Sequence, residues 1–108
     1  MPGVGTITVQ ELHDRLGQNP PPLLVDVREL DEWDFCRIEG ARHLPMSEIQ
    51  QRVDELDPGQ ETVVFCHHGV RSRTVAVFLM DKGFSRVSSL TGGIEAWSVL
   101  IDPSVARY

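Results

Sequence analysis

One stretch of the sequence indicates both a fold class and a reactive site: Thr62-Val63-Val64-Phe65-Cys66-His67-His68-Gly69-Val70-Arg71-Ser72. Its first five residues are mostly apolar and β-branched, which is typical of a strand buried on both faces of a parallel sheet. From Ser72 to Lys82 apolar residues recur at helical spacing, and Gly83 follows where a glycine commonly ends a helix. The stretch therefore predicts a buried strand, a short loop and a helix.

Strand and helix patterns alternate through the rest of the chain. The other predicted strands are Leu23–Val27, Val87–Leu90 and a short edge strand at Arg42–Pro45. The other predicted helices are a segment that begins with a Thr8–Glu11 capping box and runs to about Leu16, followed by Ser47–Leu56 and Ile94–Leu100. Strands that alternate with helices over short links favour a parallel sheet covered on both faces. We predict a single α/β domain over residues 1–108, with a core at about 6–100 and a mostly parallel sheet of about five strands.

Length and composition agree with one domain. The chain has 108 residues, a mass of 12.1 kDa and 41% hydrophobic residues. Its longest uninterrupted apolar run, Val75 to Met80, is too short to span a bilayer, and no basic segment followed by an apolar one opens the chain. The two cysteines, Cys36 and Cys66, are too few for a disulfide framework and too far apart for a CxxC pair. We expect a cytoplasmic protein without a membrane partner.

The charge distribution argues against nucleic acid as a partner. The formal net charge is −6, whereas a nucleic-acid-binding domain normally presents a basic patch to the phosphates. One local exception is the segment 62–80, which has no carboxylate but contains His67, His68, Arg71 and Arg73. This segment could attract a small anion within an otherwise acidic chain.

Cys66 is the strongest candidate for a reactive residue. In open α/β sheets, ligands bind at the carboxyl ends of strands, and Cys66 ends the best predicted strand. The loop from His67 to Arg71 contains Gly69 and precedes a helix, so its amides and the helix dipole could stabilise negative charge on the sulfur. Such surroundings favour the thiolate, which is the nucleophilic form of cysteine. The alternative is a cysteine that only fills the core.

The neighbouring residues allow several roles. His67 and His68 are adjacent to Cys66 and cannot readily converge with it on a metal, so we expect no metal site; they could act in proton transfer or contribute mainly loop shape. Arg71 could bind an anion or brace the loop, unless it is merely a surface charge. For Cys36, which lies in an amphipathic stretch, we expect packing, with a redox or resolving thiol as the alternative. Trp33 and Trp97 are most simply packing residues.

Three groups of motifs follow one another along the chain. The first comprises Asp26-Val27-Arg28-Glu29, Glu32-Trp33-Asp34-Phe35 and Ile38-Glu39-Gly40-Ala41-Arg42-His43-Leu44-Pro45. The second is Phe65-Cys66-His67-His68-Gly69-Val70-Arg71-Ser72, and the third runs from Gly83-Phe84 to Leu90-Thr91-Gly92-Gly93-Ile94-Glu95-Ala96-Trp97. Together they resemble the amino-terminal, active-site-loop and carboxyl-terminal signatures of rhodanese homology domains. The resemblance extends over roughly Thr6 to Leu100.

The resemblance implies a rhodanese-like sandwich and a sulfurtransferase that needs no cofactor. Its members carry sulfane sulfur as a persulfide on the residue that Cys66 matches, taking it from a donor such as thiosulfate and passing it to a thiophilic acceptor. Cyanide is the usual laboratory acceptor, and a thiol or a protein thiol is another. The resemblance assigns substrate binding to the loop residues His67, His68, Gly69, Val70, Arg71 and Ser72. It further implies that Asp26 and Arg28 support the loop.

One position departs from the family pattern, and two other functions compete with this one. Arg37 stands where the family often has histidine, so a role for position 37 stays open. A cysteine phosphatase or arsenate reductase of the same fold would place its arginine one position later, where this chain has Ser72. A binding module, or a sulfur carrier that acts only with a protein partner, is the other alternative. The sequence does not specify an oligomeric state.

Overall fold

Five parallel strands form the centre of the computed structural model, which describes residues 5–108. The strands are β1 (Gly5–Ile7), β2 (Leu23–Asp26), β3 (Arg42–His43), β4 (Thr62–Phe65) and β5 (Val87–Leu90). They lie side by side in the order β1-β5-β4-β2-β3, and every neighbouring pair is parallel. The central strand β4 pairs with β2, with Val64 opposite Val25. The predicted α/β class and the parallel sheet are confirmed.

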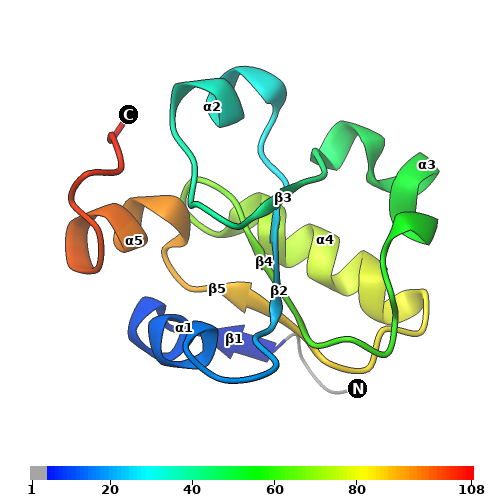
Figure 1. Ribbon diagram of the computed structural model, residues 1–108. Coiled ribbons are helices and arrows are strands. Elements are labelled where there is room, and N and C mark those ends of the chain that lie inside the picture. The colour runs from blue at the N-terminus through cyan, green and yellow to red at the C-terminus, as the bar shows by residue number, and fades with distance from the viewer. Residues whose placement is uncertain (1–4) are drawn as a thin grey trace.

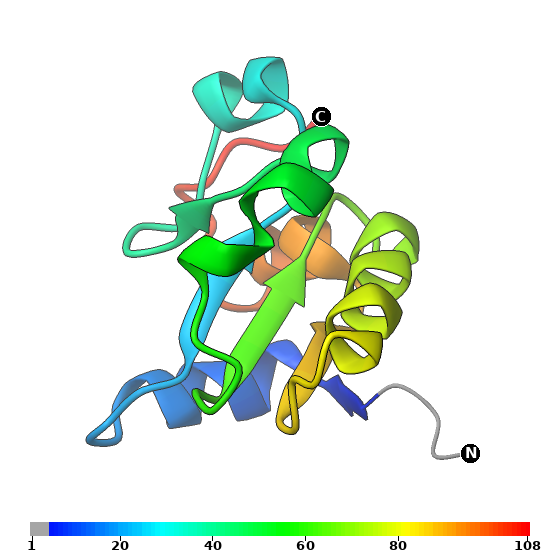
Figure 2. The same cartoon turned by 90° about the vertical axis from the view of Figure 1, so that its right-hand side faces the viewer.

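Helices cover both faces of this sheet (Figure 1). They are α1 (Val9–Leu16), α2 (Leu30–Phe35), α3 (Ile49–Arg52), α4 (Val70–Asp81) and α5 (Gly93–Leu100). α3 and α4 contribute to the apolar layer on one face, and α1 and α5 to the layer on the other. Figure 2 shows α4 beside β4 and the carboxyl-terminal segment near α2.

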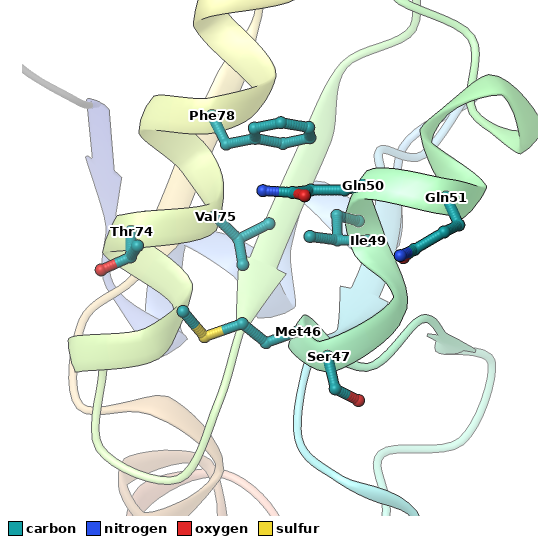
Figure 3. Close-up of a pocket in the computed structure, with 8 residues that line it drawn as sticks. All are labelled: Met46, Ser47, Ile49, Gln50, Gln51, Thr74, Val75 and Phe78. Atoms are coloured by element: carbon teal, nitrogen blue, oxygen red, sulfur yellow. The ribbon is translucent and has the colours of Figure 1, made fainter.

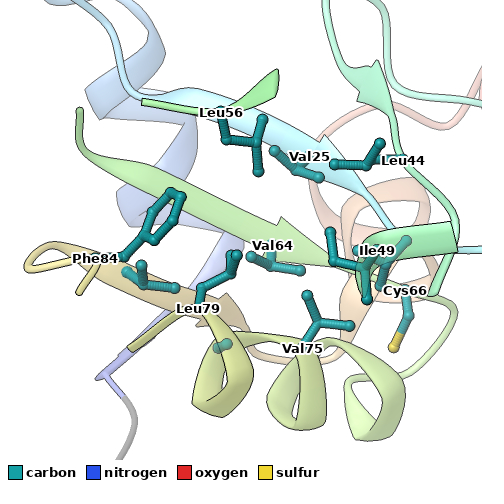
Figure 4. Packing of buried hydrophobic residues seen from close by; sticks show 12 residues of the cluster. Val25, Leu44, Ile49, Leu56, Val64, Cys66, Val75, Leu79 and Phe84 are labelled. Atoms are coloured by element: carbon teal, nitrogen blue, oxygen red, sulfur yellow. The ribbon is translucent and has the colours of Figure 1, made fainter. Parts of the chain in front are cut away.

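The two apolar layers follow from the alternation of side chains along β4. Val64 enters the layer with α4, whereas Val63 and Phe65 enter the layer with α1 and α5. Successive side chains of a strand point to opposite faces, so a strand between two layers of helices is apolar at most positions. Figure 4 shows the first layer, in which Cys66 lies at one end near Val75.

Several predicted boundaries need correction. The helix expected at Ser47–Leu56 is instead three short pieces: a 3-10 turn at Met46–Glu48, α3, and a second 3-10 turn at Val53–Glu55. Tight 3-10 turns are frequent at helix ends, and Pro58 disfavours helical geometry at the preceding residue. α4 begins at Val70, two residues before the predicted start, because Gly69 turns the chain with a positive φ of 119°.

Two elements were not predicted at all. β1 is only three residues long, which is too short for a periodic pattern, and it is held by pairing with β5. α2 overlaps the stretch before Cys36 that we interpreted only as amphipathic. Among residues 5–108, no helix combines the length and apolar character that crossing a bilayer requires.

Candidate active site

Cys66 directly follows the central strand β4 and lies at its carboxyl end, as predicted (Figure 4). The residue is only 1% exposed. Because the thiol stands between the end of β4 and the start of α4, the local backbone determines its surroundings.

Two backbone amides point at the sulfur. The Gly69 N–H donates to Cys66 Sγ over 3.1 Å, and the Ser72 N–H donates to it over 3.4 Å. The Ser72 hydroxyl lies 3.5 Å from the same sulfur and 2.7 Å from the hydroxyl of Ser89 on β5. Ser72 occupies the first turn of α4, where the helix dipole favours negative charge. Of the loop amides expected to face the sulfur, that of Gly69 donates to it, and the Ser72 amide of α4 is a second donor.

The amino-terminal end of α5 holds the other side of the loop. The Ile94 N–H donates to the Cys66 carbonyl over 2.9 Å, and the Glu95 N–H donates to the His67 carbonyl over 3.1 Å. Gly93 makes this approach possible, because a Cβ at this position would lie 2.4 Å from the Cys66 carbonyl oxygen and 2.5 Å from that of His67. With both carbonyls bound to α5, the Cys66–His67 and His67–His68 peptide planes are fixed.

The side chain of Arg71 binds Glu32 of α2. Its two terminal nitrogens donate to the two carboxylate oxygens of Glu32 over 2.6 and 2.9 Å. These bonds lower the pKa of Glu32 to about 2, so the carboxylate is charged at neutral pH. Of the two roles expected for Arg71, the structure shows the bracing of the loop; direct contact with an anion stays a prediction.

Asp26 and Arg28 form a fully buried ion pair beneath α2. Arg28 Nη2 donates to Asp26 Oδ2 over 2.7 Å and to the Cys36 carbonyl over 2.6 Å, and Nη1 donates to the Glu32 carbonyl over 3.2 Å. Burial acts to lower the pKa of Arg28, but hydrogen bonds with Asp26 and Tyr108 outweigh it and raise that pKa above its ordinary value. The pair supports the helix that carries Glu32, and through Glu32 it supports Arg71.

The two histidines of the loop differ in their surroundings. His67 stacks on His68 with ring centroids 3.9 Å apart, and among the described residues its buried Nε2 has no hydrogen-bond partner. Burial, followed by the influence of His68, lowers the pKa of His67, which favours a neutral ring. His68 and Val70 are exposed at the rim of the loop.

Tyr108 is part of this site, although the sequence interpretation did not include it. Its ring stacks on His67, with centroids 3.8 Å apart and an angle of 8° between the planes. Its hydroxyl accepts from Arg28 Nη1 over 3.0 Å and donates to Glu32 Oε2 over 2.8 Å. No local signal identifies Tyr108, since it lies 41 positions after His67 and beyond the motifs of the resemblance.

The remaining candidates lie away from the sulfur. Cys36 is partly buried against the α1–α5 layer, in agreement with a packing role. Trp33 stacks on His43 with ring centroids 4.8 Å apart, and the Arg37 guanidinium carbon lies 4.4 Å from the centroid of the Trp33 ring. Trp97 is buried in the core. Arg37 therefore contacts an aromatic ring at the surface.

A separate hollow of about 370 Å³ lies between α3 and α4 (Figure 3). Met46, Ile49, Thr74 and Phe78 are among the residues that line it. None of its lining residues belongs to the Cys66 loop, so the hollow and the reactive sulfur are distinct features.

Comparison with known proteins agrees with this geometry. The model of the rhodanese-like domain matches residues 8–100. The thiosulfate sulfurtransferase GlpE of Glaesserella parasuis is 38% identical over 91 residues, which are 84% of this chain and 83% of that protein. The probable adenylyltransferase/sulfurtransferase MoeZ of Mycobacterium tuberculosis is 36% identical over 105 residues, which are 95% of this chain but 27% of that protein.

Solved structures give the same result. A rhodanese-like domain protein from Staphylococcus aureus superposes with a TM-score of 0.85 at 28% identity, covering 97% of this chain and 99% of that one. A rhodanese-related protein from Thermoplasma volcanium gives a TM-score of 0.83 at 27% identity, covering 96% and 99%. These likenesses support a sulfurtransferase activity in general. The chain belongs to the rhodanese-like domain family.

Proposed function

We propose that this protein transfers sulfane sulfur from thiosulfate to a thiophilic acceptor through a persulfide on Cys66. The observation that carries the proposal is the placement of the Cys66 sulfur, which receives backbone N–H bonds from Gly69 and Ser72 at the amino-terminal end of α4. Fixed donors of this kind favour an anionic sulfur and need no rearrangement when charge develops on it.

In the first step the Cys66 thiolate attacks the outer sulfur of thiosulfate. A new S–S bond forms, the bond between the two sulfurs of thiosulfate breaks, and its electron pair leaves with sulfite. The product is a Cys66 persulfide, whose outer sulfur carries the negative charge. The loop amides and the dipole of α4 would stabilise this charge, as covalent catalysis requires of its intermediate.

In the second step an acceptor attacks the outer sulfur of the persulfide. With cyanide, a C–S bond forms while the S–S bond breaks, which releases thiocyanate and restores the Cys66 thiolate. A thiol or a protein thiol would instead leave as a persulfide. No cofactor is needed, because the electron pairs move only between sulfur and the attacking nucleophile.

The spacing of the loop supports sulfur rather than a phosphoryl group, because Arg71 follows Cys66 after four residues and a cysteine phosphatase would have its arginine one position later. Both amide nitrogens lie within 3.4 Å of Cys66 Sγ, and the Arg71 guanidinium is paired with Glu32. We expect the donor to meet the exposed rim of the loop, where His68 and Val70 lie, and the amides of Gly69 and Ser72 to hold the transferred sulfur.

Two exposed apolar side chains, one at this rim and one on α2, favour one further candidate, a carrier that exchanges sulfur with a protein partner. Val70 is 79% exposed. Phe35 is 58% exposed, and its ring centroid lies 5.7 Å from that of Tyr108. A protein acceptor could cover both, whereas a small ion would leave them in water. This candidate predicts slow turnover with cyanide but fast transfer to a protein thiol.

The test is thiocyanate formation from thiosulfate and cyanide by the wild type and by two single-cysteine variants. We expect Cys66→Ala to fold normally and to lose all turnover. Cys36→Ser, the matched control at the other cysteine, is expected to retain most of it. Full activity of Cys66→Ala would exclude the proposed mechanism, and complete loss in a folded Cys36→Ser would show that the wrong thiol has been assigned.

A further inference from the structure

The carboxyl-terminal segment of the chain returns from α5 to the reactive loop. Ser98 of α5 donates its hydroxyl to the Val105 carbonyl over 2.6 Å, and Val105 is buried. Arg107 then pairs with Glu95 of α5 at 2.6 Å. The segment ends with Tyr108 beside α2 and the Cys66 loop, and the red trace in Figure 1 shows the course of this end of the chain.

The side chain of Tyr108 makes two kinds of contact there. Its ring covers one face of the His67 ring, while His68 stacks on His67 as well. Its hydroxyl bridges Arg28 and Glu32, with 3.0 Å to the guanidinium and 2.8 Å to the carboxylate. One residue therefore contacts both the residue next to the reactive cysteine and the ion-pair system that braces the loop.

The protonation of the phenol suits this bridge. Burial raises the pKa of Tyr108 to about 12, so the hydroxyl keeps its proton at neutral pH. It can then accept from the cationic Arg28 and donate to the anionic Glu32 at the same time. The carboxylate also accepts from Arg71 and from the Glu29 N–H, so Tyr108 completes the set of donors that holds it.

We propose that Tyr108 is a positioning residue for the reaction of Cys66, acting through the stacked His67 and through the Glu32–Arg71 pair. The hydroxyl holds Glu32 where Arg71 binds it, and Arg71 immediately precedes Ser72, whose amide points at the sulfur. The ring holds His67, whose carbonyl is bound by α5. The role in sulfur transfer rests on the proposed function, but the positioning of Cys66 itself does not.

The experiment compares Tyr108→Phe, Tyr108→Ala and the control Arg107→Ala with the wild type. Tyr108→Phe removes the hydroxyl and keeps the stacking ring, and Tyr108→Ala removes both. Arg107→Ala weakens the attachment of the same segment at an exposed ion pair, without altering Tyr108. Three quantities are measured: the rate at which iodoacetamide alkylates Cys66, the kcat of sulfur transfer, and the urea midpoint of unfolding. Peptide mass analysis shows that the alkylated residue is Cys66.

We expect Tyr108→Phe to lower the alkylation rate and kcat by roughly 3- to 10-fold, since the net contribution of one typical hydrogen bond corresponds to about this factor in a rate. Tyr108→Ala should lower both further, and Arg107→Ala should leave both within about 2-fold. The pKa of the Glu32 carboxyl, followed by NMR, should rise from about 2 in Tyr108→Phe, because the phenol hydrogen bond that helps to lower it is lost. A fall in the alkylation rate at an unchanged urea midpoint is the result that a purely structural role would not produce.

Two results would overturn the role of Tyr108. One is an alkylation rate of Tyr108→Phe equal to that of the wild type. The other is an equal loss in Arg107→Ala, which would assign the effect to attachment of the segment rather than to the phenol. A wild type that alkylates normally but transfers no sulfur from thiosulfate would contradict the proposed function alone, because alkylation requires no sulfur donor.

Discussion

Replacing Gly93 by alanine tests how α5 holds the reactive loop. The new Cβ would lie 2.4 Å from the Cys66 carbonyl oxygen and 2.5 Å from that of His67. Both oxygens are backbone atoms, so the clash can be relieved only by moving α5 away from the loop. That movement breaks the hydrogen bonds of the Ile94 and Glu95 amides to these carbonyls.

The expected loss of stability follows from two contributions. Gly93 has a φ of +58°, and a left-handed conformation costs a residue with a Cβ about 1–2 kcal/mol. The loss of the two hydrogen bonds adds about 1 kcal/mol for each bond. We therefore expect Gly93→Ala to lower the free energy of unfolding by about 3–4 kcal/mol, a large fraction of the ~5–15 kcal/mol typical of a native domain.

Gly40→Ala is the matched control, because Gly40 also has a positive φ of 86° but has nothing within 4 Å of its added Cβ. It should lose only the ~1–2 kcal/mol of backbone strain. Urea unfolding at constant slope measures both values, and the alkylation rate of Cys66 should fall only in Gly93→Ala. Equal losses in the two variants would refute the argument that Gly93 allows α5 to bind the loop carbonyls.

Two other changes test the support of the loop and its contacts with the sulfur. Glu32→Gln removes the charge that pairs with Arg71, in a contact where the Glu32 side chain is 17% exposed and that of Arg71 33%. It should lower the free energy of unfolding, measured in urea, by about 1–2 kcal/mol. The control Glu39→Gln, at an exposed position, should change it by less than about 0.5 kcal/mol. The pKa of Glu32 is lowered from 4.5 to about 2, so the stabilising effect of its carboxylate is complete above about pH 5 and is lost as the pH falls towards 2. A difference in unfolding free energy between the wild type and Glu32→Gln that persisted unchanged at about pH 2 would contradict this assignment. Ser72→Ala removes a hydroxyl 3.5 Å from the reactive sulfur but keeps the amide that donates to it. We therefore expect kcat to fall by less than about 10-fold in a folded variant. A complete loss of turnover would show that the hydroxyl rather than the amide is essential.

Most of the fold could be predicted because its signals are local. Burial on both faces makes residues 63–65 of β4 a continuous apolar run, and the alternation of strands and helices favours a parallel sheet. The position of Cys66 followed from the same reasoning, since loops at the carboxyl ends of parallel strands gather at one edge. The helix start at Val70 was missed by two residues because only the backbone of Gly69 determines it.

The support of the site could not be predicted because its contacts join distant parts of the chain. Arg71 binds Glu32 across 39 positions, and Tyr108 binds the same carboxylate across 76. Neither Glu32 nor Tyr108 belongs to a periodic pattern that would identify it as a partner of the loop. From the sequence, Arg71 is a cation that could bind an anion, and only the tertiary structure shows that it is paired with the carboxylate of Glu32.

The central claim is that Cys66 carries the transferred sulfur, and intact-protein mass spectrometry tests it most directly. Wild type and Cys66→Ala are incubated with thiosulfate, and a portion of each is then treated with cyanide. We predict that the wild type alone gains the mass of one sulfur atom, and that cyanide removes it with release of thiocyanate. A wild type that gains no mass while Cys66 still reacts with iodoacetamide, or a gain that survives in Cys66→Ala, would contradict the account.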